Sequence, residues 1–257
     1  MSIRSLLRTT AQLMAGVFVA ATLSVGAWAG SFSEAQEKEI GELVKQYLLN
    51  NPEILRDAFA ELEKRETAAK EKLAQQGIAD NADTLYKSKL SYVAGNAEGD
   101  ITMVEFFDYN CGFCKRAFGD VLSILDSDPK LRLVVKEFPI LGPGSLFASR
   151  AAIASKEQGK YWDFHVALMQ ARGSLDEAKV MSIAKKLGLD ADKLRKDMDA
   201  PRVNAEIEET YALANKLGVN GTPAFIIDDK LIPGAMGLQA LQQQVASVRQ
   251  SGGCKVC

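Results

Sequence analysis

The four cysteines of this 257-residue chain fall into two C-x-x-C pairs. Cys111 and Cys114 enclose Gly-Phe, and Cys254 and Cys257 enclose Lys-Val. A thiolate is both the nucleophile of disulfide exchange and a ligand for soft metals. The spacing is therefore compatible with a redox-active pair, a structural disulfide or, for both pairs together, a Cys₄ zinc site.

The residues around the first pair favour redox chemistry. An apolar run at 101–107 predicts a strand, and a helical pattern follows to about residue 125. Asn110 is a suitable N-cap, which would place Cys111 in the first helical turn, where free N–H groups and the helix dipole stabilise a thiolate. Cys114, one turn later, would be more buried and act as the resolving thiol. Structural zinc sites favour turn-like knuckles instead.

A second motif, Gly-Thr-Pro at 221–223, stands directly before a predicted strand at 224–227. A proline at the start of a strand is a candidate for a cis peptide bond. Such a turn would expose the backbone of Thr222 to an extended substrate segment while the cysteine pair reacts with it. Thr222 and Pro223 are therefore candidate site residues.

The remaining pattern indicates an α/β fold. A second strand is predicted at 131–138, and its short distance from the preceding helix implies a parallel crossover in a central sheet. A long helical region runs from about 142 to 218, followed by a hairpin at 224–233 and a helix at about 239–248.

The first 29 residues predict a cleaved signal peptide. Arg4 and Arg8 precede an apolar stretch at 13–25, and Ala-Trp-Ala at 27–29 is a suitable cleavage site. An uncleaved membrane anchor over 11–29 is the alternative. Export would suit disulfide chemistry, which persists in the periplasm. The net charge of −2, with no basic block, argues against a nucleic-acid partner.

Residues 30–83 predict a helical segment with Ser33 as an N-cap and a linker from Gly77 to Asp83. Apolar residues between Ile40 and Leu62 fall on one stripe, which is too small to form a core alone. The stripe must be covered by the same chain's larger domain or by another subunit.

Between about residues 91 and 248 the chain resembles the DsbA-like thioredoxin-fold family. The resemblance rests on residues 104–114, on the helical insertion at about 142–218, and on residues 221–225. It implies a thioredoxin fold over 84–250 interrupted by a helical subdomain, with Cys111 nucleophilic, Cys114 resolving and Pro223 cis.

The same resemblance places Glu105 at the buried acid of the strand leading to the active site. Lys136 falls where a lysine of the neighbouring strand can approach that acid. A buried carboxylate there could exchange a proton with the resolving thiol, and a purely structural Glu–Lys pair is the alternative. His165, the one histidine, is interpreted as a core or boundary residue.

Gly112 and Phe113 look like the Gly-Tyr of disulfide isomerases, and the N-terminal helices resemble the oligomerisation segment of the ScsC branch. This implies a periplasmic isomerase or reductase that forms homo-oligomers, with a trimer favoured. Its clients would be unfolded or misoxidised exported proteins, its reductant a membrane electron donor of the DsbD/ScsB type, and no cofactor is expected. A monomeric DsbA-type dithiol oxidase is the alternative.

Residues 251–257 are predicted to form a flexible tail outside the resemblance. Cys254 and Cys257 could bind Cu(I), form an auxiliary redox pair, or form an incidental disulfide. The first option supports a function of another class, a copper-binding or copper-tolerance protein on a thioredoxin scaffold.

Overall fold

The computed structural model describes residues 32–257, so the predicted signal peptide lies outside the described residues. The chain divides into two compact units, with the boundary between Phe59 and Ala60. Within residues 32–257, no helix combines the length and the apolar character that a membrane span requires.

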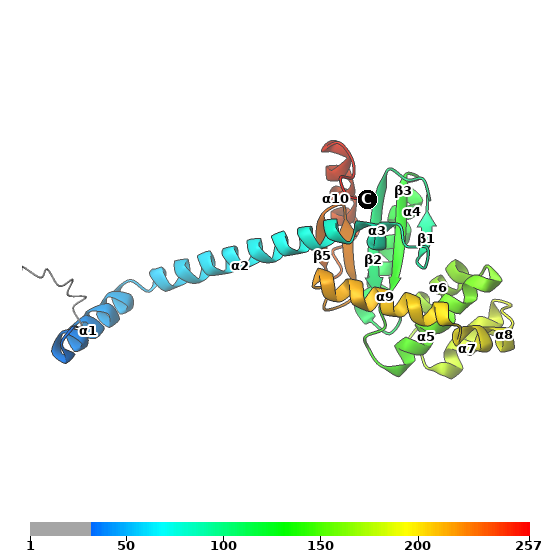
Figure 1. Cartoon of the computed structure of the whole chain (residues 1–257), viewed down its shortest axis with the longest axis horizontal. Helices are drawn as coiled ribbons and strands as arrows, with labels where there is room; N and C mark the ends of the chain where they lie inside the picture. Colours follow the sequence, from blue (N-terminus) through cyan, green and yellow to red (C-terminus); the bar gives the residue numbers. More distant parts are fainter. Residues whose placement is uncertain (1–31) are drawn as a thin grey trace, which may run out of the picture. The chain divides into compact units, whose positions relative to one another are not determined.

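In chain order (Figure 1) the elements are α1 (Glu34–Asn50), α2 (Glu53–Asp80), α3 (Ala82–Tyr86), β1 (Tyr92–Gly95), β2 (Ile101–Phe107), α4 (Gly112–Ser127), β3 (Leu131–Glu137), α5 (Pro143–Ala154), η1 (Ser155–Gln158), α6 (Tyr161–Gln170), α7 (Glu177–Lys186), α8 (Ala191–Met198), α9 (Pro201–Leu217), β4 (Ala224–Ile227), β5 (Lys230–Pro233) and α10 (Leu238–Gln250).

The larger unit, residues 60–257, is built on a five-stranded sheet with the order β1-β3-β2-β4-β5. Strands β2 and β3 are parallel, with Ile101 opposite Leu131, which confirms the predicted crossover through α4. Strands β1, β4 and β5 each pair antiparallel with their neighbours. Helices α5 to α9 form the predicted insertion between β3 and β4. The α/β thioredoxin fold with a helical insertion is therefore confirmed.

Successive side chains of β2 point to opposite faces of this sheet. Met103 and Phe107 join one core cluster, to which α4, the insertion and α10 also contribute. Val104 and Phe106 join a second cluster with residues of α9 and α3. Glu105 shares the parity of Met103 and Phe107, so it lies on the face that α4 covers.

The predicted linker at 77–83 is helical for most of its length. Helix α2 continues to Asp80, and α3 begins two residues later. Ile78 is fully buried in the second cluster. Gly77 also packs closely, because a Cβ there would lie 3.1 Å from the carbonyl oxygen of Lys216. Tertiary packing thus overrides the turn-like composition of this segment.

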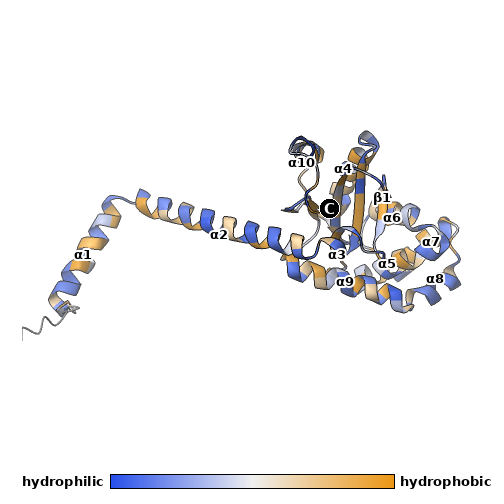
Figure 2. Cartoon of the chain, turned by 45° about the horizontal axis from the view of Figure 1, so that its top comes forward, coloured by the Kyte–Doolittle hydropathy of each residue, from blue (hydrophilic) through white to orange (hydrophobic). Residues whose placement is uncertain are grey.

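Helix α1 begins with the predicted cap, in which Ser33 and Gln36 form a reciprocal capping box. Within this unit the apolar side chains of α1 remain uncovered, and Leu43 and Tyr47 are 68% and 58% exposed. Figure 2 shows hydrophobic stretches along the ribbon of α1 and mostly hydrophilic residues along α2. The apolar side chains of α1, which we call the exposed stripe together with those of the first half of α2, therefore have no packing partner within their own unit.

Candidate active site

Cys111 is itself the N-cap of α4, so the predicted cap at Asn110 is wrong by one residue. Its sulfur accepts a hydrogen bond from the backbone N–H of Cys114 at 3.4 Å. Its thiol donates to the carbonyl oxygen of Thr222 at 3.2 Å. Both cysteines are free and buried. The cap geometry thus directs a backbone N–H of the first helical turn at the Cys111 sulfur.

The peptide bond between Thr222 and Pro223 is cis, as predicted, and it leads directly into β4. This turn brings residues that are 111 positions apart in the sequence into contact at the Cys111 sulfur. A groove of about 360 Å³ lies beside it, lined by residues 218–224 and by Leu231, Pro233 and Gly234 of the hairpin. An extended segment has room to lie along this edge.

The two residues between the cysteines face outward. Phe113 is 61% exposed, and the guanidinium of Arg116 lies 4.3 Å from the centre of its ring. Lys115 turns the other way, because its ammonium donates to the carbonyl oxygens of Ala171 and Gly173 at 2.7 and 3.0 Å. The surface beside the sulfur therefore combines the Phe113 ring with the Arg116 guanidinium, whereas the charge of Lys115 belongs to the contact with the insertion.

Asn110 takes a different role from the predicted cap. Its side-chain amide donates to the carbonyl of Leu175 at 3.1 Å and its oxygen accepts the Leu175 N–H at 2.6 Å. These two bonds, with those of Lys115, attach the active-site loop and the start of α4 to the loop between α6 and α7. The insertion thereby helps to position the cysteine pair.

Glu105 is completely buried, and neither carboxylate oxygen has a hydrogen-bond partner. Burial raises its pKa to about 8. Burial also raises the pKa of the Cys114 thiol, and the negative charge of Glu105 adds to that rise. The two groups thus disfavour simultaneous ionisation, which is the arrangement needed for one to take the other's proton.

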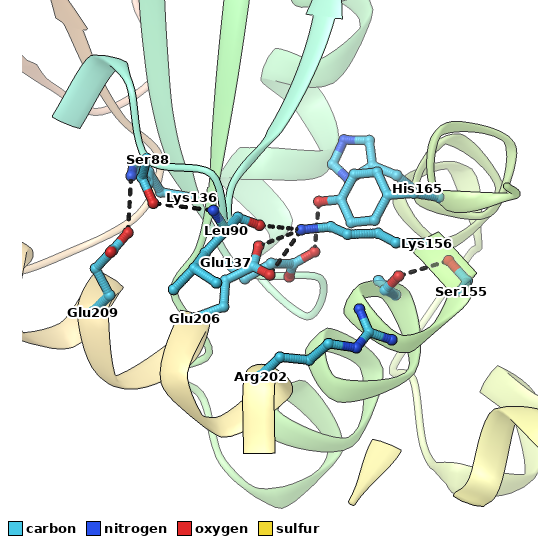
Figure 3. Close-up of polar contacts among 12 residues, drawn as sticks. Ser88, Leu90, Lys136, Glu137, Ser155, Lys156, His165, Arg202, Glu206 and Glu209 are labelled. Atoms are coloured by element: carbon cyan, nitrogen blue, oxygen red, sulfur yellow. Dashed lines mark hydrogen bonds and ion pairs between the residues drawn. The ribbon is translucent and has the colours of Figure 1, made fainter. Parts of the chain in front are cut away.

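The predicted approach of Lys136 to Glu105 is wrong. In the parallel register Glu105 lies opposite Val135, whereas Lys136 lies opposite Phe106. The Lys136 side chain therefore belongs to the other face of the sheet, where its ammonium donates to the carbonyl of Thr84 at 2.8 Å and lies 3.6 Å from Glu209. Figure 3 shows Lys136 among the polar contacts on the α9 side. Lys136 is a structural residue here.

Asp108, which the sequence analysis did not single out, organises the loop before Cys111. Its buried carboxylate accepts hydrogen bonds from the backbone N–H groups of Asn110, Ile140 and Leu141 at 2.7 to 2.9 Å and from the Ser145 hydroxyl at 2.7 Å. It joins the ends of β2 and β3 to the start of α5. In the sequence, the signal that could have pointed to Asp108 is an acidic residue directly after a predicted strand.

His165 is a core residue, as predicted. It is fully buried among aromatic rings, and its Nδ1 lies 2.9 Å from the Tyr109 hydroxyl. Burial lowers its pKa to about 3. Tyr109 and Tyr161 both donate to Glu137, at 2.9 and 2.7 Å, and burial raises the pKa of that carboxyl to about 8. Figure 3 shows His165 and Glu137 within this interior polar group.

Cys254 and Cys257 form a disulfide in the structure. The tail segment, which we define as residues 251–257, is not free of the fold, because the N–H of Lys255 donates to Asp228 at 2.7 Å. Among residues 32–257, no three His, Cys, Asp or Glu side chains are grouped so that they could hold a metal ion. The described residues therefore do not support a zinc site shared by the two cysteine pairs.

Two family profiles match the chain. Residues 102–246 match the family described as "DSBA-like thioredoxin domain", which includes the Cys111 and Cys114 pair, Asp108 and the cis-proline turn. Residues 36–69 match "Copper resistance protein ScsC N-terminal domain", which covers most of the exposed stripe of α1 and α2.

Solved structures give the same assignment over larger parts of the chain. A thioredoxin-like oxidoreductase from Silicibacter pomeroyi is 50% identical, with a TM-score of 0.65 over 65% of this chain and 97% of that one. A linker-deletion mutant of Proteus mirabilis ScsC is 28% identical, with a TM-score of 0.66 over 87% and 99%. The thiol-disulfide exchange protein alpha-DsbA2 from Wolbachia pipientis is 29% identical, with a TM-score of 0.65 over 70% and 98%.

The curated relatives are much longer proteins. A Na⁺/H⁺ antiporter, NhaA 1, from Salinispora arenicola is 30% identical over 158 residues, which are 61% of this chain but 24% of that protein. The chain thus spans about a quarter of the length of the curated relatives that it matches.

Proposed function

The chain belongs to the DsbA-like thioredoxin family, and on this basis we propose that it is an exported protein thiol–disulfide oxidoreductase. One observation carries the proposal: a free cysteine pair begins α4, with the Cys111 sulfur in contact with both the Cys114 N–H and the Thr222 carbonyl. This contact places the nucleophile at the cis-proline turn, and Thr222, which it contacts, also lines the groove in which a client segment would lie.

The reaction begins when the Cys111 thiolate attacks a client disulfide and forms a mixed disulfide, releasing one client cysteine as a thiolate. Two outcomes follow. The freed client thiolate can attack another client disulfide, and the client thiolate released there then attacks the client sulfur of the mixed disulfide. The client is thereby rearranged, and Cys111 leaves as a thiolate. Alternatively Cys114 attacks Cys111, which releases the reduced client, and Glu105 accepts the Cys114 proton.

The surface beside the sulfur supports isomerase or reductase action over oxidation. Phe113 presents an exposed aromatic side chain to unfolded clients. The ammonium of Lys115 is occupied by the insertion carbonyls. A pair kept reduced would need a reductant, for which a membrane electron donor of the DsbD/ScsB type is the proposed source. The substrates would be misoxidised periplasmic proteins.

We propose that the protein forms a homo-oligomer, with a trimer favoured, through residues 36–69. The exposed stripe of α1 and the first half of α2 supplies an apolar surface for helix pairing between subunits. Oligomerisation would also shield reduced Cys111 from the cell's oxidase.

A refolding assay with a scrambled-disulfide substrate tests whether the protein acts as an isomerase or as an oxidase. We expect the reduced protein to restore activity to scrambled ribonuclease without added oxidant, and the C111S variant to do nothing. Rapid oxidation of reduced, unfolded ribonuclease by the disulfide form, with no recovery of the scrambled substrate, would instead establish a dithiol oxidase. The reduction potential of the pair supplies an independent measure, since strong oxidants lie near −120 mV and thioredoxin near −270 mV.

A copper-tolerance role is the second candidate, because the family matched by residues 36–69 carries "copper resistance" in its description. Thiolates are the ligands that Cu(I) prefers. Cu(I) titration of the fully reduced protein against a chelator, compared with C111S/C114S and C254S/C257S, would assign any binding to one pair. Equal affinity in all three proteins would remove both pairs from a copper role.

A further inference from the structure

The tail segment is held on the larger unit by one buried carboxylate. Asp228, 3% exposed, accepts the N–H of Lys255 at 2.7 Å and that of Val256 at 3.3 Å. Asp228 is fixed in turn, since its backbone adopts a positive φ of 54° between β4 and β5 and its carbonyl accepts the Tyr86 hydroxyl. A rigid acceptor thus receives two consecutive N–H groups from within the second C-x-x-C motif.

Apolar contacts add to this attachment. Val256 and Cys257 pack against the second core cluster, which contains Ile78 at the end of α2 and Tyr86 of α3. Cys254 packs against the first cluster. Cys254 and Cys257 are nevertheless only partly buried residues.

The second pair repeats the local geometry of the first. The Cys257 N–H donates to the Cys254 sulfur at 3.1 Å, as the Cys114 N–H does to Cys111 at 3.4 Å. A sulfur that already accepts an N–H is a better leaving group in disulfide exchange, and it keeps this bond beside Asp228, whose Oδ1 lies 3.4 Å from the Cys254 sulfur. A disulfide that closes so short a loop also restrains the unfolded chain little. Both points favour exchange chemistry over a structural role.

In this structure the two cysteine pairs lie toward opposite ends of β4. Cys111 contacts Thr222 at one end of β4, whereas Asp228 follows the other end. The strand between them spans about 10 Å at roughly 3.3 Å per residue. Disulfide exchange requires the sulfurs to touch. In this arrangement the electrons for the second pair would come from another molecule.

We propose that Cys254 and Cys257 form a second thiol–disulfide site, which reacts with a dithiol of a separate molecule and whose oxidation fastens the tail segment to Asp228. A thiolate of the dithiol attacks one sulfur, the Cys254–Cys257 bond breaks, and the other cysteine leaves and is protonated. The second thiol of the dithiol then displaces the remaining cysteine. Two electrons and two protons pass to the pair, and the dithiol becomes a disulfide.

The disulfide between Cys254 and Cys257 explains why oxidation would hold the tail segment on Asp228. The disulfide holds Lys255 and Val256 in the turn that aligns their N–H groups on one Asp228 oxygen. Opening the ring restores backbone freedom to this turn, which costs free energy to order again. Reduction should therefore loosen the tail segment while the core stays folded.

The C111S/C114S variant isolates this site, because it lacks the pair on which the proposed function depends. The protein is equilibrated in mixtures of reduced and oxidised dithiothreitol, acid-quenched, alkylated and analysed by mass spectrometry of the peptide that holds both tail cysteines. Amide hydrogen exchange of residues 251–257 is measured in the fully oxidised and in the fully reduced protein. C254S/C257S serves as the permanently open control.

We expect a reversible two-electron transition while circular dichroism shows a folded protein. Exchange at Lys255 and Val256 should rise at least tenfold on reduction, to the level of C254S/C257S. The proposal is overturned if the pair stays oxidised until the protein unfolds, or if reduction leaves amide exchange unchanged. Since the variant has no Cys111 or Cys114, neither result depends on the isomerase proposal.

Discussion

At the scale of single residues, the unpartnered carboxyl group of Glu105 carries the clearest kinetic consequence. Its pKa of about 8 leaves it largely protonated at pH 6 and about half ionised at pH 8. If the ionised form accepts the Cys114 proton, release of the mixed disulfide should accelerate as pH rises toward 8. We expect E105Q to abolish this rise and to slow release at pH 8 by about a hundredfold.

Rapid-quench measurement of a Cys111–glutathione mixed disulfide checks this expectation, with K136Q as the matched control. Lys136 is also buried in the sheet but faces away from Glu105, so its replacement should leave the pH profile unmoved. Identical profiles for E105Q and the wild type between pH 5 and 8 would remove Glu105 from the mechanism.

His165 carries a consequence for stability rather than for rate. Its pKa in the folded protein is about 3, below the unfolded value of 6.5, so the unfolded state binds a proton first. Its contribution to stability is complete above pH 6.5 and is lost as pH falls toward 3, at about 1.4 kcal/mol per pH unit.

Urea unfolding between pH 4 and 8 measures this loss. H165F should show a shallower decline below pH 6.5 than the wild type, even though it also loses the bond to Tyr109 at every pH. The comparison uses slopes, to which that pH-independent loss does not contribute. Parallel declines in the two proteins would show that His165 titrates normally in the fold.

At the scale of elements, the start of α5 is tightly packed against the loop that holds Asn110. A Cβ on Gly144 would lie 2.3 Å from the carbonyl oxygen of Leu175. G144A must therefore displace the loop whose residue Leu175 exchanges two hydrogen bonds with Asn110. We expect a loss of about 2 kcal/mol in stability and slower disulfide exchange at Cys111.

G119A is the matched control for this prediction. Gly119 lies within α4 and an added Cβ meets nothing within 4 Å, so alanine should raise stability by about 0.5–1 kcal/mol. Thermal unfolding and the rate of Cys111 alkylation report both effects. Equal stability of the two variants would show that the α5 contact tolerates a methyl group.

The sequence predicted most of these elements because their signals are local. Strand β2 was predicted at its observed bounds, and the Ser33 cap and the helical insertion were also recognised. Strand β1 was missed because its four residues carry no sustained alternation. The side of the sheet reached by Lys136 was missed because a shift of one residue in register moves a side chain to the opposite face.

At the scale of the whole molecule, contacts between distant segments lay beyond sequence reasoning. The sequence analysis paired the Thr222–Pro223 turn with the cysteines as a substrate-binding element, but no local pattern predicted the direct contact of Thr222 with Cys111. The attachment of Asn110 to Leu175, 65 residues away, and of the tail segment to Asp228 has no periodic signal. Each such contact depends on the packing of the completed fold, which local patterns do not encode.

The exposed stripe of α1 and α2 leads to a prediction about assembly. Replacing Leu43 and Tyr47 together by Glu places charge in an apolar surface of at least two helical turns. We expect light scattering to change from an oligomer, a trimer by our proposal, to a monomer, because burying unpaired carboxylates between subunits is strongly unfavourable.

L73E is the control, since Leu73 is also exposed on α2, at 73%, but lies outside the stretch that matches the ScsC N-terminal domain. It should keep the wild-type mass. A monomeric wild-type protein, or an oligomer that survives L43E/Y47E, would contradict the proposed assembly surface.

The outward placement of the two residues between the active-site cysteines also has an evolutionary consequence. Phe113 is mostly exposed, and a side chain on Gly112 would meet only the tip of Arg116, at an ordinary 3.6 Å. Mutations at these two positions therefore leave the core intact. Natural selection can vary the dipeptide, and with it the redox behaviour of the pair, without passing through poorly folded intermediates. Oxidising and reducing descendants of one ancestor are thus separated by a short mutational path.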